Sequence, residues 1–433
     1  MNISSDNIKI KQVFFSEVFL LKERVIFHID VNSAYLSWEA VYRLQHGEKV
    51  DLREIPSVVG GDSTKRHGIV LSKSIPAKKY NIATGETIYS ALQKCPNLVV
   101  VQPNFELYLN ASNALIELLS EYSSKIQRYS IDEAFLDYTD GEKHWEDAAY
   151  EIKERIKREL GFTVNIGVGP NKLLAKMASD FEKPDKIHTL FKDEIKDKMW
   201  PLPVEDLFMV GPRTKAKLNK RGIFTIGDLA NLNRDYIYSW LKKPGLLIWE
   251  YANGIDNSIV RSEPLPVKSI GNSTTTAFDV DNRKEAHMIL LALSEKVSMR
   301  IRAINRVAYV VSVGVKNSNF FSYSKQMKLD MPTDSTNTIY ETAKKLFDEM
   351  WQGEPLRLLS VSLSELLDNN FYQLSFFEDE NIKEKLFDRT VDNIRGRFGQ
   401  KSIFRSCFLH SGIDPLIGGV TIEEEYPMMS SKI

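Results

Sequence analysis

Two short apolar segments that carry acidic residues constrain the fold more than any other feature of the sequence. The run VIFHI at 25–29 is typical of a buried strand that ends at Asp30, and a helical apolar pattern follows it. SIDEAFLD at 130–137 predicts a second strand, with Asp132 and Glu133 inside it. Adjacent acids within an apolar strand are costly unless a cation compensates them. The pattern therefore predicts a sheet that brings carboxylates together around a cation.

Carboxylates on neighbouring strands suit magnesium, which retains waters and substrate phosphate oxygens and needs few protein ligands. A pair of such ions can stabilise the attacking and leaving oxygens of nucleotidyl transfer. Asp30, Asp132 and Glu133 are therefore the candidate catalytic and metal-binding residues. Taken singly, an acid at a strand end is more simply explained as a solvated turn residue.

The chain has 433 residues, which is longer than one hydrophobic core usually grows, so several domains are expected. Strands and crossing helices over 24–200 indicate an α+β domain. Short helices broken by glycines over 201–262 indicate a small helical module. Over 268–366 the order strand, helix, strand, strand, helix, strand predicts a βαββαβ domain. Residues 367–433 are more polar and predict a tail with one amphipathic helix around 380–398.

Charge, cysteine content and hydropathy limit the class of protein. The net charge of −1 neither requires nor excludes a nucleic-acid partner, so local charge has to decide. The two cysteines, Cys95 and Cys407, form no CxxC pair and favour a reducing cytoplasm without a zinc site. No apolar run is long enough to suggest a membrane span. The N-terminal extension, 1–23, lacks the features of a targeting signal.

Three sequence blocks carry a family resemblance: HIDVNSAYLSWE, YSIDEAFLD and GVGPNKLLAKMASDFEKPD. Through them, and from about residue 24 to 410, the chain resembles the Y-family translesion DNA polymerases, the DinB/UmuC group. The resemblance implies a multidomain α+β right-hand polymerase with palm and fingers over 24–200 and fingers at about 50–100. It implies a helix-hairpin-helix thumb over 201–262 and a little finger over 268–366. With Asn32, the first block resembles that of a UmuC-like branch of the family from Gram-positive bacteria.

The resemblance also implies an activity and a metal site. A protein of this family extends primers past damaged bases with low fidelity, using primer–template DNA and dNTPs. Asp30 and the Val31 carbonyl, with Asp132 and Glu133, would hold two Mg²⁺ ions, for which Mn²⁺ can substitute. A cytoplasmic monomer is expected, with accessory damage-response subunits as further partners.

Nucleotide-binding residues follow from the same blocks. Tyr35 stands where the family places a steric gate, a ring that would collide with a ribose 2′-hydroxyl. Ser72 and Lys78 match the fingers segment that covers the triphosphate, although Ile-Pro replaces the more frequent Tyr-Glu there. Lys172 matches the lysine that meets the triphosphate. The alternatives are an ordinary core aromatic for Tyr35 and a solvated helix lysine for Lys172.

DNA and clamp contacts are predicted further along the chain. In VGPRTKAKLNKRGI, Gly211 lets backbone N–H groups approach a DNA phosphate, and no acid interrupts the cations that follow. The predicted DNA-binding residues are Gly211, Arg213, Lys215, Lys217 and, in the little finger, Lys268. The segment QLSFF is similar to a sliding-clamp-binding peptide, with Gln373, Leu374, Phe376 and Phe377 as anchors. A solvated basic face and simple packing of QLSFF are the alternatives.

Two other functions are compatible with parts of the sequence. One is a noncatalytic factor that binds DNA and docks on the clamp while retaining the polymerase fold. The other is a two-metal nucleotide cyclase, for which Gly60-Gly61-Asp62 would be the relevant feature. No strand hairpin is expected around these glycines, and a cyclase needs no basic thumb hairpin. The intact trio of acids favours the polymerase over both.

Overall fold

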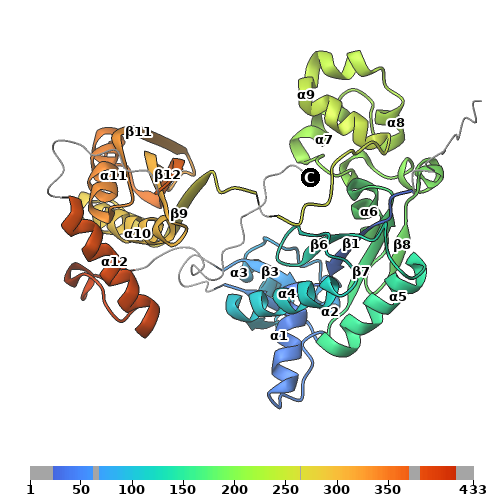
Figure 1. Ribbon diagram of the computed structural model, residues 1–433, viewed down its shortest axis with the longest axis horizontal. Coiled ribbons are helices and arrows are strands. Elements are labelled where there is room, and N and C mark those ends of the chain that lie inside the picture. Colours follow the sequence, from blue (N-terminus) through green and yellow to red (C-terminus); the bar gives the residue numbers. More distant parts are fainter. Residues whose placement is uncertain (1–22, 62–67, 264, 370–380, 416–433) are drawn as a thin grey trace, which may run out of the picture.

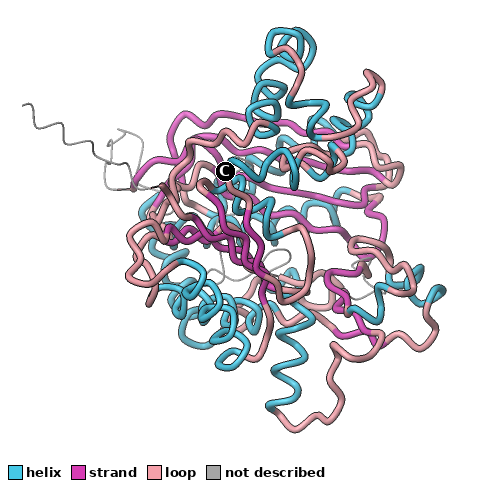
Figure 2. Tube along the Cα trace, turned by 90° about the vertical axis from the view of Figure 1, so that its right-hand side faces the viewer, coloured by secondary structure: helices cyan, strands magenta, loops and turns pink. Residues whose placement is uncertain are grey.

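A computed structural model describes residues 23–61, 68–263, 265–369 and 381–415. Figure 1 shows one sheet with its helices on the right, a helical module above it, and a second sheet with its own helices on the left. Figure 2 shows the same elements from the side, with helices flanking the strands. The architecture is the mixed α+β multidomain arrangement that the sequence predicts.

The palm is a five-stranded sheet in the order β5-β6-β1-β7-β8. Its strands are β1 (Ile26–Val31), β5 (Ile126–Arg128), β6 (Glu133–Asp137), β7 (Val164–Gly169) and β8 (Ile187–Thr189). The helices around it are α1 (Ala34–Gln45), α4 (Phe105–Ser120), α5 (Trp145–Arg155), which a π-helical turn continues to Leu160, and α6 (Lys172–Ser179). All of β1 is buried because both of its faces are covered. Asp30 therefore lies within the strand, one residue before its end.

The fingers contain a three-stranded sheet in the order β3-β2-β4, with two short helices. The elements are β2 (Ser57–Gly60), β3 (Val70–Lys73), α2 (Ile75–Lys78), α3 (Ile88–Lys94) and β4 (Val99–Val101). Strands β2 and β3 are antiparallel neighbours, so they form a hairpin. Gly60 is the last residue of β2, and Gly61 follows it. The expectation that no strand hairpin surrounds these glycines is wrong. The cause is that β2 is only four residues long and too short for its pattern to be recognised.

The thumb consists of α7 (Pro212–Asn219), α8 (Ile226–Ala230) and α9 (Arg234–Ala252). The first two helices form the helix-hairpin-helix. Thr225 caps α8 because its hydroxyl accepts the N–H of Asp228, whose carboxylate in turn accepts the N–H of Thr225. Asn233 caps α9 in a similar way. Polar side chains thus cap both helices that follow α7.

The little finger has the βαββαβ order predicted from the sequence, in a sheet ordered β11-β10-β12-β9. Its elements are β9 (Ser269–Val280), α10 (Arg283–Ala303), β10 (Arg306–Asn317), β11 (Ser322–Thr333), α11 (Thr336–Met350) and β12 (Leu356–Asp368). Both helices cover one face of the sheet, where Val311 and Val313 are fully buried. The other face carries mainly small polar side chains.

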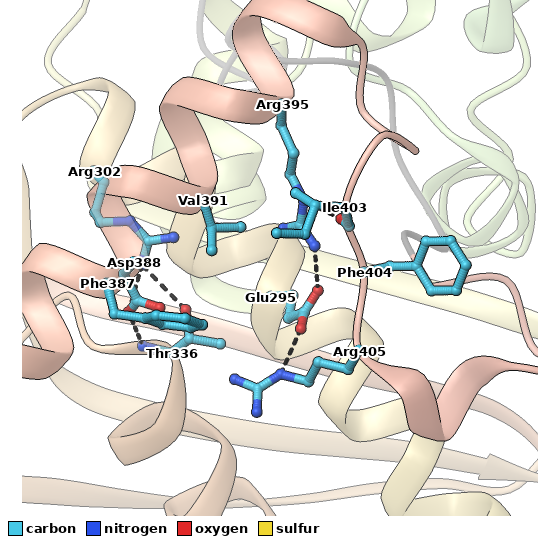
Figure 3. Close-up of a pocket in the computed structure, with 10 residues that line it drawn as sticks. All are labelled: Glu295, Arg302, Thr336, Phe387, Asp388, Val391, Arg395, Ile403, Phe404 and Arg405. Carbon is cyan, nitrogen blue, oxygen red and sulfur yellow. Dashed lines mark hydrogen bonds and ion pairs between the residues drawn. The ribbon is translucent and has the colours of Figure 1, made fainter.

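The described part of the C-terminal segment packs against the little finger. Helix α12 (Asn381–Phe398) lies beside α10 and α11, and it coincides with the predicted amphipathic helix. Buried Glu295 of α10 accepts hydrogen bonds from Arg395 at 2.9 Å and Arg405 at 2.7 Å, as Figure 3 shows. Arg302 bridges to Asp388 at 3.2 Å. Ion pairs with α10 therefore attach this segment, which the sequence predicts as a polar tail, to the little finger.

Candidate active site

The three predicted acids lie at one end of two central strands of the palm. Asp30 of β1 is the direct cross-strand partner of Glu133 of β6. Asp132 lies in the turn just before β6, and its carbonyl accepts the N–H of Val31 at 3.0 Å. Directly opposed residues of antiparallel strands project from the same face, so Asp30 and Glu133 are neighbours. Val31, predicted as a ligand through its carbonyl, is the last residue of β1.

Glycine in β7 allows α6 to lie close to the face that carries these acids. A Cβ atom on Gly167 would come within 1.9 Å of the Ala175 carbonyl oxygen and 2.4 Å of the Ser179 nitrogen. No other residue fits there without moving the helix. This close packing brings the α6 side chains, Lys176 among them, to the acids. The VNIGVG segment thus positions part of the site.

Glu133 is held as an anion. Its Oε2 accepts a hydrogen bond from Lys176 Nζ at 2.9 Å and lies 3.6 Å from His28 Nε2. Burial raises the pKa of Glu133, but the nearby His28 ring and the hydrogen-bonded Lys176 ammonium group outweigh burial and lower the pKa to about 2. Oε1 has no hydrogen-bond partner among the described residues. One oxygen of this carboxylate is therefore fixed and the other is open.

The pKa values of the two aspartates are shifted upward, in the opposite direction to that of Glu133. Burial raises the pKa of Asp30 despite its contact with the Lys183 ammonium group. Burial also raises the pKa of Asp132, although Ser130 donates a hydrogen bond to its Oδ1 at 2.5 Å. Both carboxylates would therefore gain from further positive charge. Asp30 Oδ1 and Asp132 Oδ2 have no hydrogen-bond partner in the described part of the chain.

These acids fit divalent cations without forming a closed cage. Across the described ranges, no three acidic, histidine or cysteine side chains converge as a preformed metal site. Magnesium does not need such a cage, because waters and phosphate oxygens complete its shell. Such an ion would use the three open carboxylate oxygens, one each from Asp30, Asp132 and Glu133. The raised pKa values of the two aspartates fit a site that a cation completes. In the protein alone, the ammonium groups of Lys176 and Lys183 supply the positive charge.

The structure does not bring Lys172 to the acids. Its side chain is 1% exposed, and its ammonium group donates to Gln127 Oε1 at 3.0 Å. Gln127 Oε1 also accepts the backbone N–H of Arg261 at 3.1 Å. The Lys172–Gln127 pair therefore anchors the segment that follows the thumb. Burial lowers the pKa of Lys172 to about 8. Lys172 therefore lies away from the carboxylates in this structure, and its contact with a triphosphate stays a prediction.

Lys183 is the lysine of the same sequence block that does reach them. Its ammonium group contacts Asp30 and lies 2.8 Å from Asp180 Oδ1. Burial lowers the pKa of Lys183, but these two carboxylates outweigh it and raise it. The available sequence signal was the motif DFEKPD, in which Lys183 follows α6 by only four residues.

The other predicted nucleotide-binding residues lie at the start of α1 or in the fingers. Tyr35 is half-buried at the start of α1, and its ring stacks on Tyr108 with centroids 4.6 Å apart. Ser72 of β3 is buried and donates to the Ser33 carbonyl at 3.2 Å, which joins the fingers to that turn. Lys78 ends α2, is exposed, and has no ion-pair partner in the described ranges. Tyr35 and Ser72 thus lie together, and Lys78 remains available.

The predicted DNA-binding residues of the thumb are exposed, with one exception. Gly211 is the N-cap of α7, and a Cβ atom there would meet nothing within 4 Å. Arg213 and Lys217 are exposed, whereas the ammonium group of Lys215 lies 2.6 Å from Glu205 Oε1. Glu205 precedes the hairpin, so the charge pattern of the hairpin segment alone does not indicate this ion pair. A cleft of about 430 Å³ separates this thumb base from α6.

Several predicted residues lie elsewhere. Lys268 is exposed immediately before β9. The clamp-binding residues Gln373, Leu374, Phe376 and Phe377 lie outside the described residues, as does most of the N-terminal extension. No helix in the described ranges has the length and hydropathy needed to cross a membrane.

The arrangement defines a class of protein. Acids meet at one end of a palm sheet, a small fingers domain contacts the turn beside them, and a basic helix-hairpin-helix stands above. A βαββαβ domain follows on an extended connection (Figure 1). This is the architecture of a right-hand polymerase with a little finger.

Comparisons with known proteins identify the family. The impB/mucB/samB family matches residues 29–180, its C-terminal domain matches 267–376, and the IMS family HHH motif matches 192–223. DNA polymerase IV of Clostridium acetobutylicum is 48% identical over 389 residues, covering 89% of this chain and 98% of that protein. DNA polymerase IV 2 of Bacillus subtilis is 38% identical over 401 residues, covering 90% and 96%. The chain belongs to the impB/mucB/samB family, the Y-family translesion DNA polymerases.

A solved structure has the same fold. A Y-family DNA polymerase chimera matches with a TM-score of 0.69 at 23% identity, covering 80% of this chain and 100% of that one. The family identification and the α+β right-hand fold expected from the sequence are confirmed.

Proposed function

We propose that this chain is a DNA-directed DNA polymerase that extends primers past damaged bases by nucleotidyl transfer at Asp30, Asp132 and Glu133. The observation that carries the proposal is the registered pairing of Asp30 with Glu133 beside Asp132, with an oxygen of each carboxylate open. Family membership and relatives named DNA polymerase IV support the reaction class.

The carboxylates act by binding positive charge where the primer hydroxyl meets the triphosphate. Two bound Mg²⁺ ions, or Mn²⁺ in their place, would stabilise the attacking and leaving oxygens. Asp30, Asp132, Glu133 and the Val31 carbonyl would hold them. Lys176 keeps Glu133 anionic and fixes one of its oxygens, so its open oxygen is presented in a constant orientation. Lys183 would give up its contact with Asp30 when the nucleotide arrives.

Cations and hydroxyls around this point would bind the triphosphate. Lys183 lies on the palm side and Lys78 on the fingers side, while Ser72 supports the turn that leads to Tyr35. Tyr35 would exclude ribonucleotides. In their described residues, the fingers contribute short strands and two short helices over the nucleotide. So small a cover checks base-pair shape weakly, which suits synthesis on distorted templates at low fidelity.

We expect Lys183→Ala to weaken nucleotide binding. Loss of a charge-assisted contact to phosphate should raise the KM for dNTP by about tenfold or more. Steady-state kinetics of single-nucleotide insertion measures this change. Lys186→Ala removes a more exposed lysine from the same segment and should leave KM within about twofold. A raised KM in Lys172→Met with a normal KM in Lys183→Ala would assign triphosphate binding to Lys172 and contradict the role of Lys183.

Grip on DNA would come from the thumb and the little finger. In the thumb, Gly211 and the exposed cations of α7 face solvent beside the cleft. In the little finger, Lys268 precedes a sheet face that helices leave uncovered. Small side chains line up across that face in two rows, Ser324-Gly314-Ser360-Ser273 and Gln326-Ser312-Ser362-Gly271. Such a surface lets a phosphate backbone approach the sheet closely.

Thumb cations should differ in their contribution to DNA affinity. Arg213→Ala and Lys217→Ala should each weaken binding uniformly across sequences and reduce the salt slope by about 1. Lys215→Ala should change the slope less, because Glu205 already pairs with Lys215. Fluorescence anisotropy at several salt concentrations measures both quantities. Equal effects for all three variants would contradict this ranking.

Partners beyond DNA and dNTP are also proposed. Gln373, Leu374, Phe376 and Phe377 would bind a sliding clamp, which raises the effective concentration of the polymerase at the primer end. Accessory damage-response subunits would join it, and the protein would act as a monomer in the cytoplasm. Pull-down with clamp, using the full chain with and without Phe376→Ala and Phe377→Ala, tests the first of these.

Running-start primer extension across a defined lesion tests the proposed function. With Mg²⁺ we expect nucleotides to be added opposite and beyond the lesion, and chelation should stop extension. A protein that binds primer–template and clamp without adding any nucleotide would overturn the proposal.

A further inference from the structure

The ring of Tyr35 is supported by a second tyrosine. Tyr108 of α4 stacks on it with centroids 4.6 Å apart and planes only 13° from parallel. Phe105 meets the Tyr35 ring edge-on at 6.2 Å. Burial raises the pKa of Tyr35, and the negative charge of Asp132 adds to the increase. Tyr35 thus has one face against Tyr108, and it follows Asp30 by five residues, in the helix that comes directly after β1.

Tyr108 is fixed at its far end. Its side chain is fully buried, and its hydroxyl donates to Glu39 Oε1 at 2.9 Å. Glu39 is 4% exposed, and its Oε2 lies 3.7 Å from Arg43 Nε. Burial raises the pKa of Tyr108, and the neighbouring Glu39 carboxylate raises it further, so Tyr108 remains a donor. A buried carboxylate is costly without such partners, so this contact is strongly held.

Geometry connects these groups. Tyr35 and Glu39 are four residues apart on α1, and residues at that spacing share one helix face. Helix α4 inserts Tyr108 against both: its ring meets the ring of Tyr35, and its hydroxyl meets the carboxylate of Glu39. Glu39 therefore fixes the ring of Tyr108, and the ring of Tyr108 in turn fixes the plane of the Tyr35 ring.

We propose that Tyr108 and Glu39 are positioning residues for sugar selectivity, which hold the Tyr35 ring where it would meet a ribose 2′-hydroxyl. Neither residue touches the nucleotide. The inference rests on the proposed role of Tyr35. Discrimination by collision requires a ring that cannot tilt away, and the stack removes that freedom on one side.

The test is the ratio of kcat/KM for a dNTP to kcat/KM for the matching rNTP. Tyr108→Leu removes the stacked ring, and this ratio should fall about five- to tenfold. Tyr108→Phe keeps the ring but loses the hydrogen bond to Glu39, so the ratio should fall by less, about two- to threefold. Glu39→Gln retains an acceptor for Tyr108, and its ratio should fall no more than that of Tyr108→Phe.

A second stacked pair in the same core supplies the control. Phe27 and Tyr138 stack with centroids 5.2 Å apart and planes 19° from parallel. Tyr138→Leu makes the same substitution there and should leave the sugar ratio unchanged while lowering stability. An equal loss of selectivity in Tyr138→Leu would reduce the effect to general loosening of the palm and overturn the inference.

Failure of the inference differs from failure of the gate. If Tyr35→Ala lowers the ratio while both Tyr108 variants leave it unchanged, Tyr35 excludes ribonucleotides without help and the positioning role is refuted. If Tyr35→Ala itself leaves the ratio unchanged, the gate and its support fall together. Should Tyr108→Leu not fold, the ratio for Tyr108→Phe decides.

Discussion

Asp132→Asn should reduce primer extension by at least about a thousandfold, because the substitution removes one negative charge from the set that would hold the metal ions. The side chain keeps its size, so its contact with Ser130 and the turn before β6 can persist. DNA affinity should stay within about twofold, since the thumb and little finger supply the grip. Single-turnover extension measures the first quantity and anisotropy the second.

Asp137→Asn is the matched control for that variant. Asp137 is the last residue of β6, the strand that follows the turn with Asp132, and it accepts hydrogen bonds from Thr139. The same loss of charge there should leave extension close to that of the unmodified protein. Normal extension by Asp132→Asn would remove the metal assignment. A similar loss in both variants would point to damage to β6 in place of lost metal binding.

Tyr35→Ala should admit ribonucleotides, with the dNTP-to-rNTP ratio of kcat/KM falling by about two orders of magnitude. The reason is steric, because the ring that would meet the 2′-hydroxyl is gone while the acids stay in place. Tyr35→Phe retains the ring and should keep most of the selectivity. Competitive insertion of a dNTP and its matching rNTP measures the ratio. An unchanged ratio in Tyr35→Ala would make Tyr35 an ordinary core aromatic.

The acids and the domain order could be predicted because their signals are local. An apolar strand with acids predicted β6 and its catalytic pair, and alternation with helices predicted the βαββαβ domain. Even so, β6 begins at Glu133, so Asp132 lies in the preceding turn. The sequence pattern predicts residues 130–132 as part of the strand, because apolar patterning does not mark where ladder hydrogen bonds begin.

What escaped prediction depends on contacts between distant segments. Lys172 looks like a surface lysine because α6 has an apolar face that excludes it, yet the segment after the thumb covers it through Gln127. The pairing of Lys215 with Glu205 and the Glu39–Tyr108 bond likewise join separate elements. Helical periodicity predicted α12 but not its partners on α10. A sequence pattern predicts which face of a helix or strand is apolar, but it seldom predicts which distant segment packs against that element.

The charge cluster around Glu295 bears on where this protein can be shortened. A chain cut after the region matched by the C-terminal family model would lose Arg395 and Arg405 while retaining Glu295 inside the little finger. The cut would remove both counter-ions of Glu295 and uncover the surface of α10 against which α12 packs, so the shortened domain should be less stable. Recombinant little fingers meant for separate study should therefore extend through residue 415, the last described residue of the docked segment.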